Sequence, residues 1–133
     1  MADKYTNIIN SMIKKWRANL KLDPVWVINS EFIPAEEMEG AYAMVNADNT
    51  EYYSASIYVS DFLTQLSEVD FKKAINEVIC HELVHLVMID FMRTAQLAAG
   101  NKQVLQEELR YKFEQFTTRI QRAFMDFDKK VGN

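Results

Sequence analysis

Residues 4–20 repeat apolar side chains at intervals of three and four, the spacing that places them on one face of an α-helix. This stripe consists of Tyr5, Ile8, Ile9, Met12, Ile13, Trp16 and Leu20. Asp3 or Thr6 can cap the start, and the Asp23-Pro24 pair ends the pattern. The sequence therefore predicts an amphipathic helix at the beginning of the chain.

The spacing then changes to that of β-strands. Residues 25–32 are rich in β-branched and aromatic side chains and are followed by Pro34, and a second candidate strand covers residues 41–45. A turn-like run at 46–50 leads to residues 52–60, where side chains alternate between two faces. One face carries Tyr53, Ala55, Ile57 and Val59, and the other carries Tyr52, Ser54, Ser56, Tyr58 and Ser60. These segments predict a small, mostly antiparallel three-stranded meander.

Two long helices are predicted after the strands. The first covers about residues 71–99, with Ser67 or Asp70 as its cap and Gly100 as its stop. Its middle part, residues 78–92, is apolar nearly all round, which is typical of a helix buried on most sides.

The last predicted helix covers about residues 103–129. Its apolar stripe consists of Leu105, Leu109, Phe113, Phe116, Ile120, Phe124 and Phe127. The order helix, three strands, helix, helix is typical of the α+β class. A length of 133 residues suits one domain, 1–133, with its own hydrophobic core.

Composition limits the location and the partners that we expect for this domain. No uncharged stretch exceeds nine residues, whereas a membrane-spanning helix needs about twenty apolar residues. The chain does not begin with the pattern of a secretory signal, and Cys80 is its only cysteine, so no internal disulfide can form. A net charge of −4 argues against a generic affinity for nucleic acid. We expect a cytoplasmic protein with neither a membrane nor a nucleic acid as partner.

The first of the two long helices contains the sequence His81-Glu82-Leu83-Val84-His85. Residues four apart lie one above the other on a helix, so both imidazoles can bind the same zinc ion. Glu82 points about 100° away from His81, where its carboxylate reaches a water on the metal but not the metal itself. The chain has no other histidine, and chance would give this arrangement only about once in a thousand times. The motif predicts one zinc ion per chain.

A catalytic zinc usually has three protein ligands and an open fourth position. The third ligand cannot be a histidine, and the glycine and histidine of the metzincin pattern would fall at Met88 and Phe91. We therefore expect a carboxylate from the last helix. The candidates are Glu107, Glu108 and Glu114.

These features resemble the gluzincins, zinc metallopeptidases that combine the two histidines of HExxH with a glutamate from a downstream helix. The order of elements is similar to that of the single-domain minigluzincins and of small metallopeptidase-like proteins of phages and bacteria. Residues 55–59 resemble the strand A-T-I-x-I of that pattern, and residues 114–124 resemble its glutamate helix, E-E-x-V-x-R-L-x-x-A-L. The resemblance implies a zincin-like fold and favours Glu114 as the third ligand, with Glu107 as the next choice.

The resemblance also implies a zinc-dependent metallopeptidase that acts on a peptide or protein substrate. Glu82 would accept a proton from the zinc-activated water as it attacks the peptide carbonyl, and would pass that proton to the leaving nitrogen. The substrate would lie extended along an edge strand, either 41–45 or 52–60. Three alternatives stay open: a catalytically silent zinc-binding interaction protein, a hydrolase that acts on something other than a peptide, and a specialist protease for one protein partner.

Overall fold

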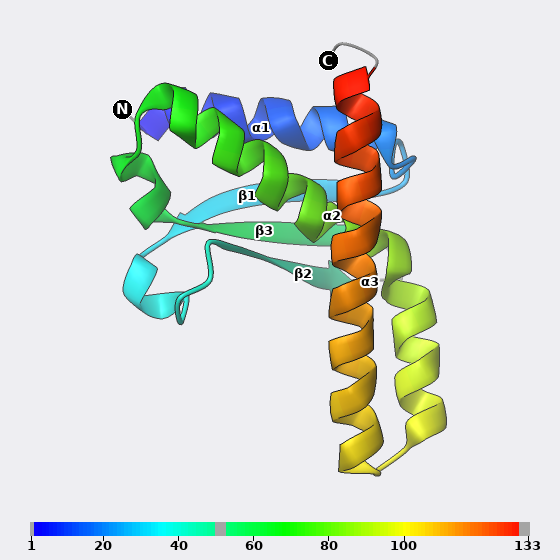
Figure 1. Ribbon diagram of the computed structural model, residues 1–133. Helices are drawn as coiled ribbons and strands as arrows, with labels where there is room; N and C mark the ends of the chain where they lie inside the picture. Colours follow the sequence, from blue (N-terminus) through cyan, green and yellow to red (C-terminus); the bar gives the residue numbers. More distant parts are fainter. Residues whose placement is uncertain (1, 50–52, 131–133) are drawn as a thin grey trace. The chain divides into compact units, whose positions relative to one another are not determined.

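The computed structural model describes residues 2–49 and 53–130, and in this part of the chain the elements follow the expected order (Figure 1). The α-helices are α1 (Ala2–Asn19), α2 (Glu68–Ala99) and α3 (Gln103–Lys130). The strands are β1 (Val27–Ile33), β2 (Ala43–Asn49) and β3 (Ser54–Ser60), and short 3-10 helices, η1 (Ala35–Glu37) and η2 (Asp61–Gln65), follow β1 and β3. The predicted α+β class is confirmed. The chain divides into two compact units, residues 1–83 and 84–133, which are described in turn.

The sheet has the strand order β1-β3-β2, with β3 in the centre. β2 pairs with β3 in antiparallel orientation, but β1 pairs with β3 in parallel, so the sheet is mixed. The predicted meander is therefore wrong. Residues 34–42 connect β1 to β2, and a connection of this length is not a tight hairpin turn that would force the two strands to pair. β3 takes the position between them.

β2 is longer than the sequence predicted. The prediction of a turn at residues 46–50 places the end of the strand too early. β2 continues to Asn49, with an irregular register near its end. Asp48 explains why this polar run stays in the strand. Its carboxylate accepts hydrogen bonds from the amide of Asn46 and from the hydroxyl of Ser56 on the neighbouring strand. Local hydrogen bonds thus replace the apolar side chains that usually mark a strand.

The alternation of side chains along β3 is confirmed and decides which face of the sheet is buried. On one face the side chains are fully buried: Ala55, Ile57 and Val59. On the other face Ser54, Ser56 and Tyr58 are half-buried, whereas Ser60 at the end of the strand is buried. Tyr53 was expected on the buried face but precedes the strand and is 42% exposed, with its ring edge-to-face against Trp26. Tyr52 lies outside the described residues.

α1 and the first half of α2 lie side by side (Figure 1). The predicted stripe of α1 supplies the buried residues Ile9, Ile13 and Trp16, and Leu20 follows directly after the helix. The indole Nε1 of Trp16 donates a hydrogen bond to Oδ1 of Asn76 on α2 at 2.8 Å. Tyr5 packs edge-to-face on Phe71, with ring centroids 4.4 Å apart. These contacts fix the part of α2 that ends with His81 and Glu82.

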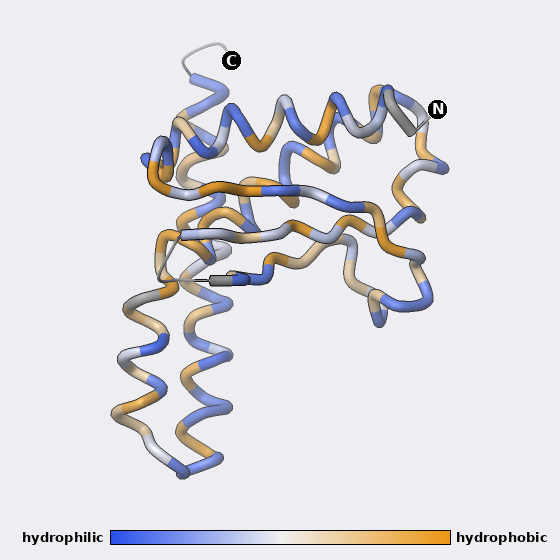
Figure 2. Tube along the Cα trace, turned by 180° about the vertical axis from the view of Figure 1, so that it is seen from behind, coloured by the Kyte–Doolittle hydropathy of each residue, from blue (hydrophilic) through white to orange (hydrophobic). Residues whose placement is uncertain are grey.

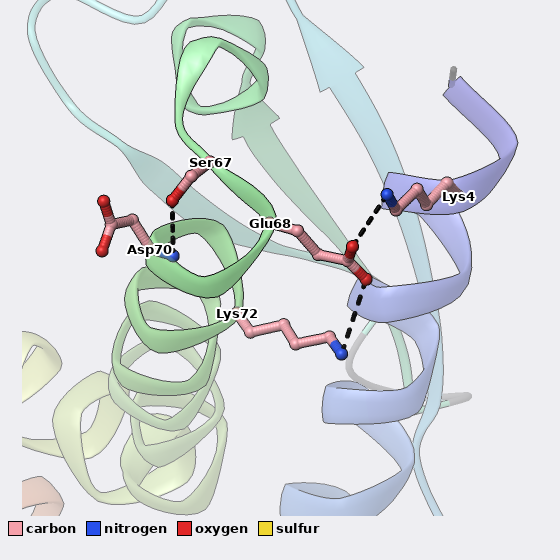
Figure 3. Close-up of polar contacts among 5 residues, drawn as sticks. All are labelled: Lys4, Ser67, Glu68, Asp70 and Lys72. Atoms are coloured by element: carbon pink, nitrogen blue, oxygen red, sulfur yellow. Dashed lines mark hydrogen bonds and ion pairs between the residues drawn. The ribbon is translucent and has the colours of Figure 1, made fainter.

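Polar contacts mark the start of α2 (Figure 3). The backbone N–H of Asp70 donates to Oγ of Ser67 at 3.2 Å, so Ser67 is the capping residue. Glu68 forms ion pairs with Lys4 of α1 at 2.8 Å and with Lys72 at 3.6 Å. The hydrogen bond and charge of Lys4 hold the pKa of Glu68 below its usual value, and Glu68 in turn raises the pKa of Lys4.

We expect the ion pair between Lys4 and Glu68 to give a small stabilisation that depends on pH. The contribution of Glu68 is present above the ordinary pKa of 4.5 and is lost as the pH falls through its lower folded value. The contribution of Lys4 is present below 10.5 and is lost as the pH rises through its higher folded value. Both groups are exposed, so salt weakens the pair.

Thermal melts of the parent and of Glu68→Gln test this expectation. The variant should melt slightly earlier near neutral pH in dilute buffer, and the two curves should converge in strong acid and at about 1 M salt. A difference that persists at high salt would show that Glu68 stabilises the fold through packing and not through charge.

In the second unit, Gly100 ends α2 with a φ of +62°, as predicted from its position. Its backbone N–H donates to the carbonyl of Gln96 at 3.2 Å. The side-chain Nε2 of Gln106 on α3 donates to the carbonyls of Gln96 and Gly100, each at 2.8 Å. Further along, Phe91 packs edge-to-face on Phe113, with ring centroids 5.8 Å apart. Residues 84–99 of α2 and α3 therefore form an antiparallel helical hairpin.

Burial in this hairpin is narrower than the sequence predicted. Within residues 78–92, Val87 is 49% exposed and Phe91 is 71% exposed, so the helix is not buried on most sides after Leu86. Apolar positions recur along α3 (Figure 2), but only Phe113 of the predicted stripe is buried among the described side chains. Four members of the stripe are exposed: Leu105, Phe116, Phe124 and Phe127. No helix in the described part of the chain is long and apolar enough to cross a membrane.

Candidate metal centre

α2 carries its two histidines at the border of its buried face. His81 and His85 are half-buried, while the residues around them are buried: Cys80, Leu83, Val84 and Leu86. Because α2 is one continuous helix, the two imidazoles project from the same side, one turn apart. The buried neighbours hold the helix in place, and the half-buried rings are accessible to an ion. Cys80 is fully buried, as a small apolar-like thiol is expected to be.

α3 brings Glu114 to His85. The carboxylate Oε2 of Glu114 lies 3.4 Å from Nε2 of His85. In an antiparallel helical hairpin, residues equally far from the turn lie at the same level. His85 precedes Gly100 by fifteen residues and Glu114 follows it by fourteen. The position of the turn, together with the contact between Phe91 and Phe113, therefore selects Glu114.

The two other glutamates considered from the sequence lie closer to the turn of the hairpin. Glu107 is about 10 Å before Glu114 along α3, and Glu108 is about 9 Å before it. Glu107 also accepts a hydrogen bond from Nε2 of Gln103 on its own helix at 3.3 Å. Both residues are exposed. Of the three candidates, Glu114 is the one at the level of the histidines.

The geometry of the three residues fits a metal ion. One ligand atom from each of His81, His85 and Glu114 lies within 4.8 Å of the other two. Two ligands that bind a tetrahedral zinc ion at about 2.0–2.1 Å are about 3.3 Å apart, so the 3.4 Å between His85 and Glu114 suits a shared ion. Two imidazole nitrogens and one carboxylate oxygen are also a donor set that zinc accepts. The three residues could hold a metal ion.

Glu82 follows His81 directly but does not belong to this triad. Its side chain is 8% exposed, unlike that of Glu114, which is 55% exposed. The position of Glu82 beside a histidine of the triad is the one that the HExxH pattern gives to a general base.

A hollow of about 500 Å³ borders α3 beside Glu114. The residues that line it include Tyr111, Lys112, Glu114, Thr118, Arg119 and Arg122. Apart from Glu114, none of these was predicted as a functional residue. On a helical wheel they fall on the polar side of α3, where charged residues ordinarily face solvent, so the sequence carried no signal for the hollow.

Comparison with known proteins gives no match: no family model, no curated protein and no solved structure matches this chain. The resemblance to gluzincins therefore rests on the HELVH sequence and on the geometry of His81, His85 and Glu114.

Proposed function

We propose that this protein is a zinc-dependent metallopeptidase, with His81, His85 and Glu114 as metal ligands and Glu82 as general base. The observation that carries the proposal is the approach of Glu114 to His85 at 3.4 Å. The sequence left three glutamates open, and the one that the resemblance favoured is the one that the hairpin places beside the histidines. Three protein ligands leave a position for water, which is the arrangement of catalytic rather than structural zinc.

The chain's own residues would do most of the chemistry. When bound, zinc supplies Lewis acidity, which lowers the pKa of a water ligand toward neutral and polarises a substrate carbonyl. Glu82 would accept the proton of the attacking water and donate it to the amine nitrogen as the peptide bond breaks. Its burial keeps this carboxylate from competing solvent. His81 and His85 would hold the ion through rings that the packed face of α2 positions.

An extended peptide would bind by adding a strand to an open edge of the sheet. β3, one of the two strands considered from the sequence, is hydrogen-bonded to β1 on one side and to β2 on the other. In the described part of the chain β2 pairs only with β3. Of these two strands, β2 is therefore the one with an edge that a peptide can join.

Glu82 distinguishes this function from that of a silent zinc-binding interaction protein. A structural zinc site gains nothing from a buried carboxylate next to one of its ligands, whereas hydrolysis requires a base there. A specialist protease for one protein partner would use the same site and would differ only in what it cleaves.

The purified protein is expected to contain one zinc ion per chain and to cleave members of a broad peptide library. A chelator should abolish both properties, and added zinc should restore them. His81→Ala should lose most of its zinc, because only two donors remain. Elemental analysis measures the metal, and mass spectrometry measures cleavage.

Undiminished zinc in His81→Ala would contradict the site. Full zinc without cleavage of any peptide would instead favour the interaction protein, and cleavage confined to one protein would favour the specialist protease.

A further inference from the structure

We propose that the hollow beside Glu114 is a subsite for a carboxylate of the substrate, bound by Arg119 and Arg122. The preferred substrates would then be acidic peptides. This inference rests on the proposed peptidase function, because it assigns the hollow to the same substrate that the metal site would cleave.

The hollow is bordered by three cations and by one carboxylate, that of Glu114. This carboxylate already interacts with His85. Within residues 2–49 and 53–130, none of the three cations forms an ion pair with an acidic side chain. The chain as a whole has a net charge of −4, so this local positive charge runs against the overall balance. A hollow lined mostly by one sign of charge concentrates ligands of the opposite sign.

The two arginines lie beyond Glu114 along α3. Glu114, Thr118 and Arg122 follow one another at intervals of four and form one row on the helix surface. Arg119 is about 7.5 Å beyond Glu114 and Arg122 is about 12 Å beyond it. Side chains on a helix lean toward its N-terminus, so both arginines lean back toward the turn of Glu114.

Arg119 shows this orientation directly. Its guanidinium carbon lies 6.0 Å from the centre of the Phe116 ring, three residues earlier on the helix. Stacking on an aromatic ring limits the freedom of the guanidinium group. A guanidinium held in this way can bind a carboxylate through two parallel hydrogen bonds.

The experiment measures peptide binding without turnover, on the zinc-loaded Glu82→Gln variant. Fluorescent peptides of one sequence carry either glutamate or glutamine at three consecutive internal positions. Amidated peptides with internal glutamate, and neutral peptides with a free C-terminus, distinguish a side-chain carboxylate from the terminal one.

The acidic peptide should bind at least about tenfold more tightly than its glutamine match in dilute buffer, because hydrogen bonds to charged groups have this strength. The advantage should shrink as salt is added. Arg119→Gln and Arg122→Gln, each made in the Glu82→Gln background, should reduce the affinity advantage of the acidic peptide severalfold. Arg119→Lys should retain part of this advantage. Arg110→Gln is the matched control, because Arg110 is exposed on the same helix but is not among the residues that line the hollow.

Equal binding of the acidic and neutral peptides would overturn the inference, as would an unchanged advantage in both arginine variants. Loss of the advantage in Arg110→Gln as well would also overturn it, because it would show a general effect of net charge. None of these results depends on cleavage. Failure of the proposed function would appear separately, as zinc-loaded parent protein that cleaves nothing.

Discussion

Replacing Glu114 by glutamine is expected to lower the affinity for zinc by at least about 100-fold. Residues that merely support a metal ligand already cost about 10–100-fold when they are changed, and Glu114 is itself the proposed third ligand. The neutral amide keeps the size of the side chain but removes the negative charge that faces His85 at 3.4 Å. Competitive chelation measures the affinity. The rise in melting temperature on adding zinc should also disappear, because a ligand that binds only the folded state stabilises it by mass action.

Glu107→Gln and Glu108→Gln are the controls for this result. Both residues are exposed and lie about two turns before Glu114 on α3. Their zinc affinity should be unchanged and their stability should stay within about 0.5 kcal/mol of the parent. If Glu107→Gln loses zinc and Glu114→Gln does not, the register of the hairpin is wrong. If none of the three loses zinc, the three-ligand site itself is wrong.

Glu82→Gln should keep its zinc and its fold but lose most hydrolytic activity. Removing a general base typically slows a reaction by about 10²–10⁴-fold. Glutamine has nearly the same shape, so the buried position of Glu82 stays filled. The proposed ligands His81 and His85 are untouched, and the zinc content should be that of the parent.

The measurement is kcat/KM on the best peptide of the library screen, with zinc content determined on the same samples. Glu108→Gln is again the control, because it removes one carboxylate from an exposed position away from the site. Turnover equal to that of the parent would reject Glu82 as the base. Loss of zinc together with activity would mean that Glu82 supports the metal and not the proton transfer.

The helices and most of their ends could be predicted from the sequence because their signals are local. The start of α1 is the exception, because the helix begins at Ala2, before the expected caps Asp3 and Thr6. The stripe of α1, the cap at Ser67 and the stop at Gly100 each depend on neighbouring residues only. Strand pairing depends on residues far apart in the chain, and no local pattern distinguishes a β1 that pairs with β2 from a β1 that pairs with β3. The extent of burial along α3 could not be predicted either, because it also depends on distant parts of the chain. An apolar stripe shows which face is apolar but not how much surface is available to cover it.

The candidate metal site also has a part that could be predicted from local sequence and a part that could not. His81 and His85 could be predicted because one helical turn brings them together. Glu114 could not be separated from Glu107 by spacing alone. The choice depends on how α3 packs back along α2, which the turn at Gly100 and the contact between Phe91 and Phe113 determine.

The central position of β3 also affects how the sheet can assemble. Residues 50–53 connect β2 to β3, whereas residues 34–53 separate β1 from β3. Loop-closure entropy makes the longer connection about 1.4 kcal/mol more costly to close. A chain that leaves the ribosome from its N-terminus therefore exposes β1 until a strand twenty residues further on has been made. Pairing β2 with β3 closes the shorter loop, and β1 completes the sheet on the other side of β3.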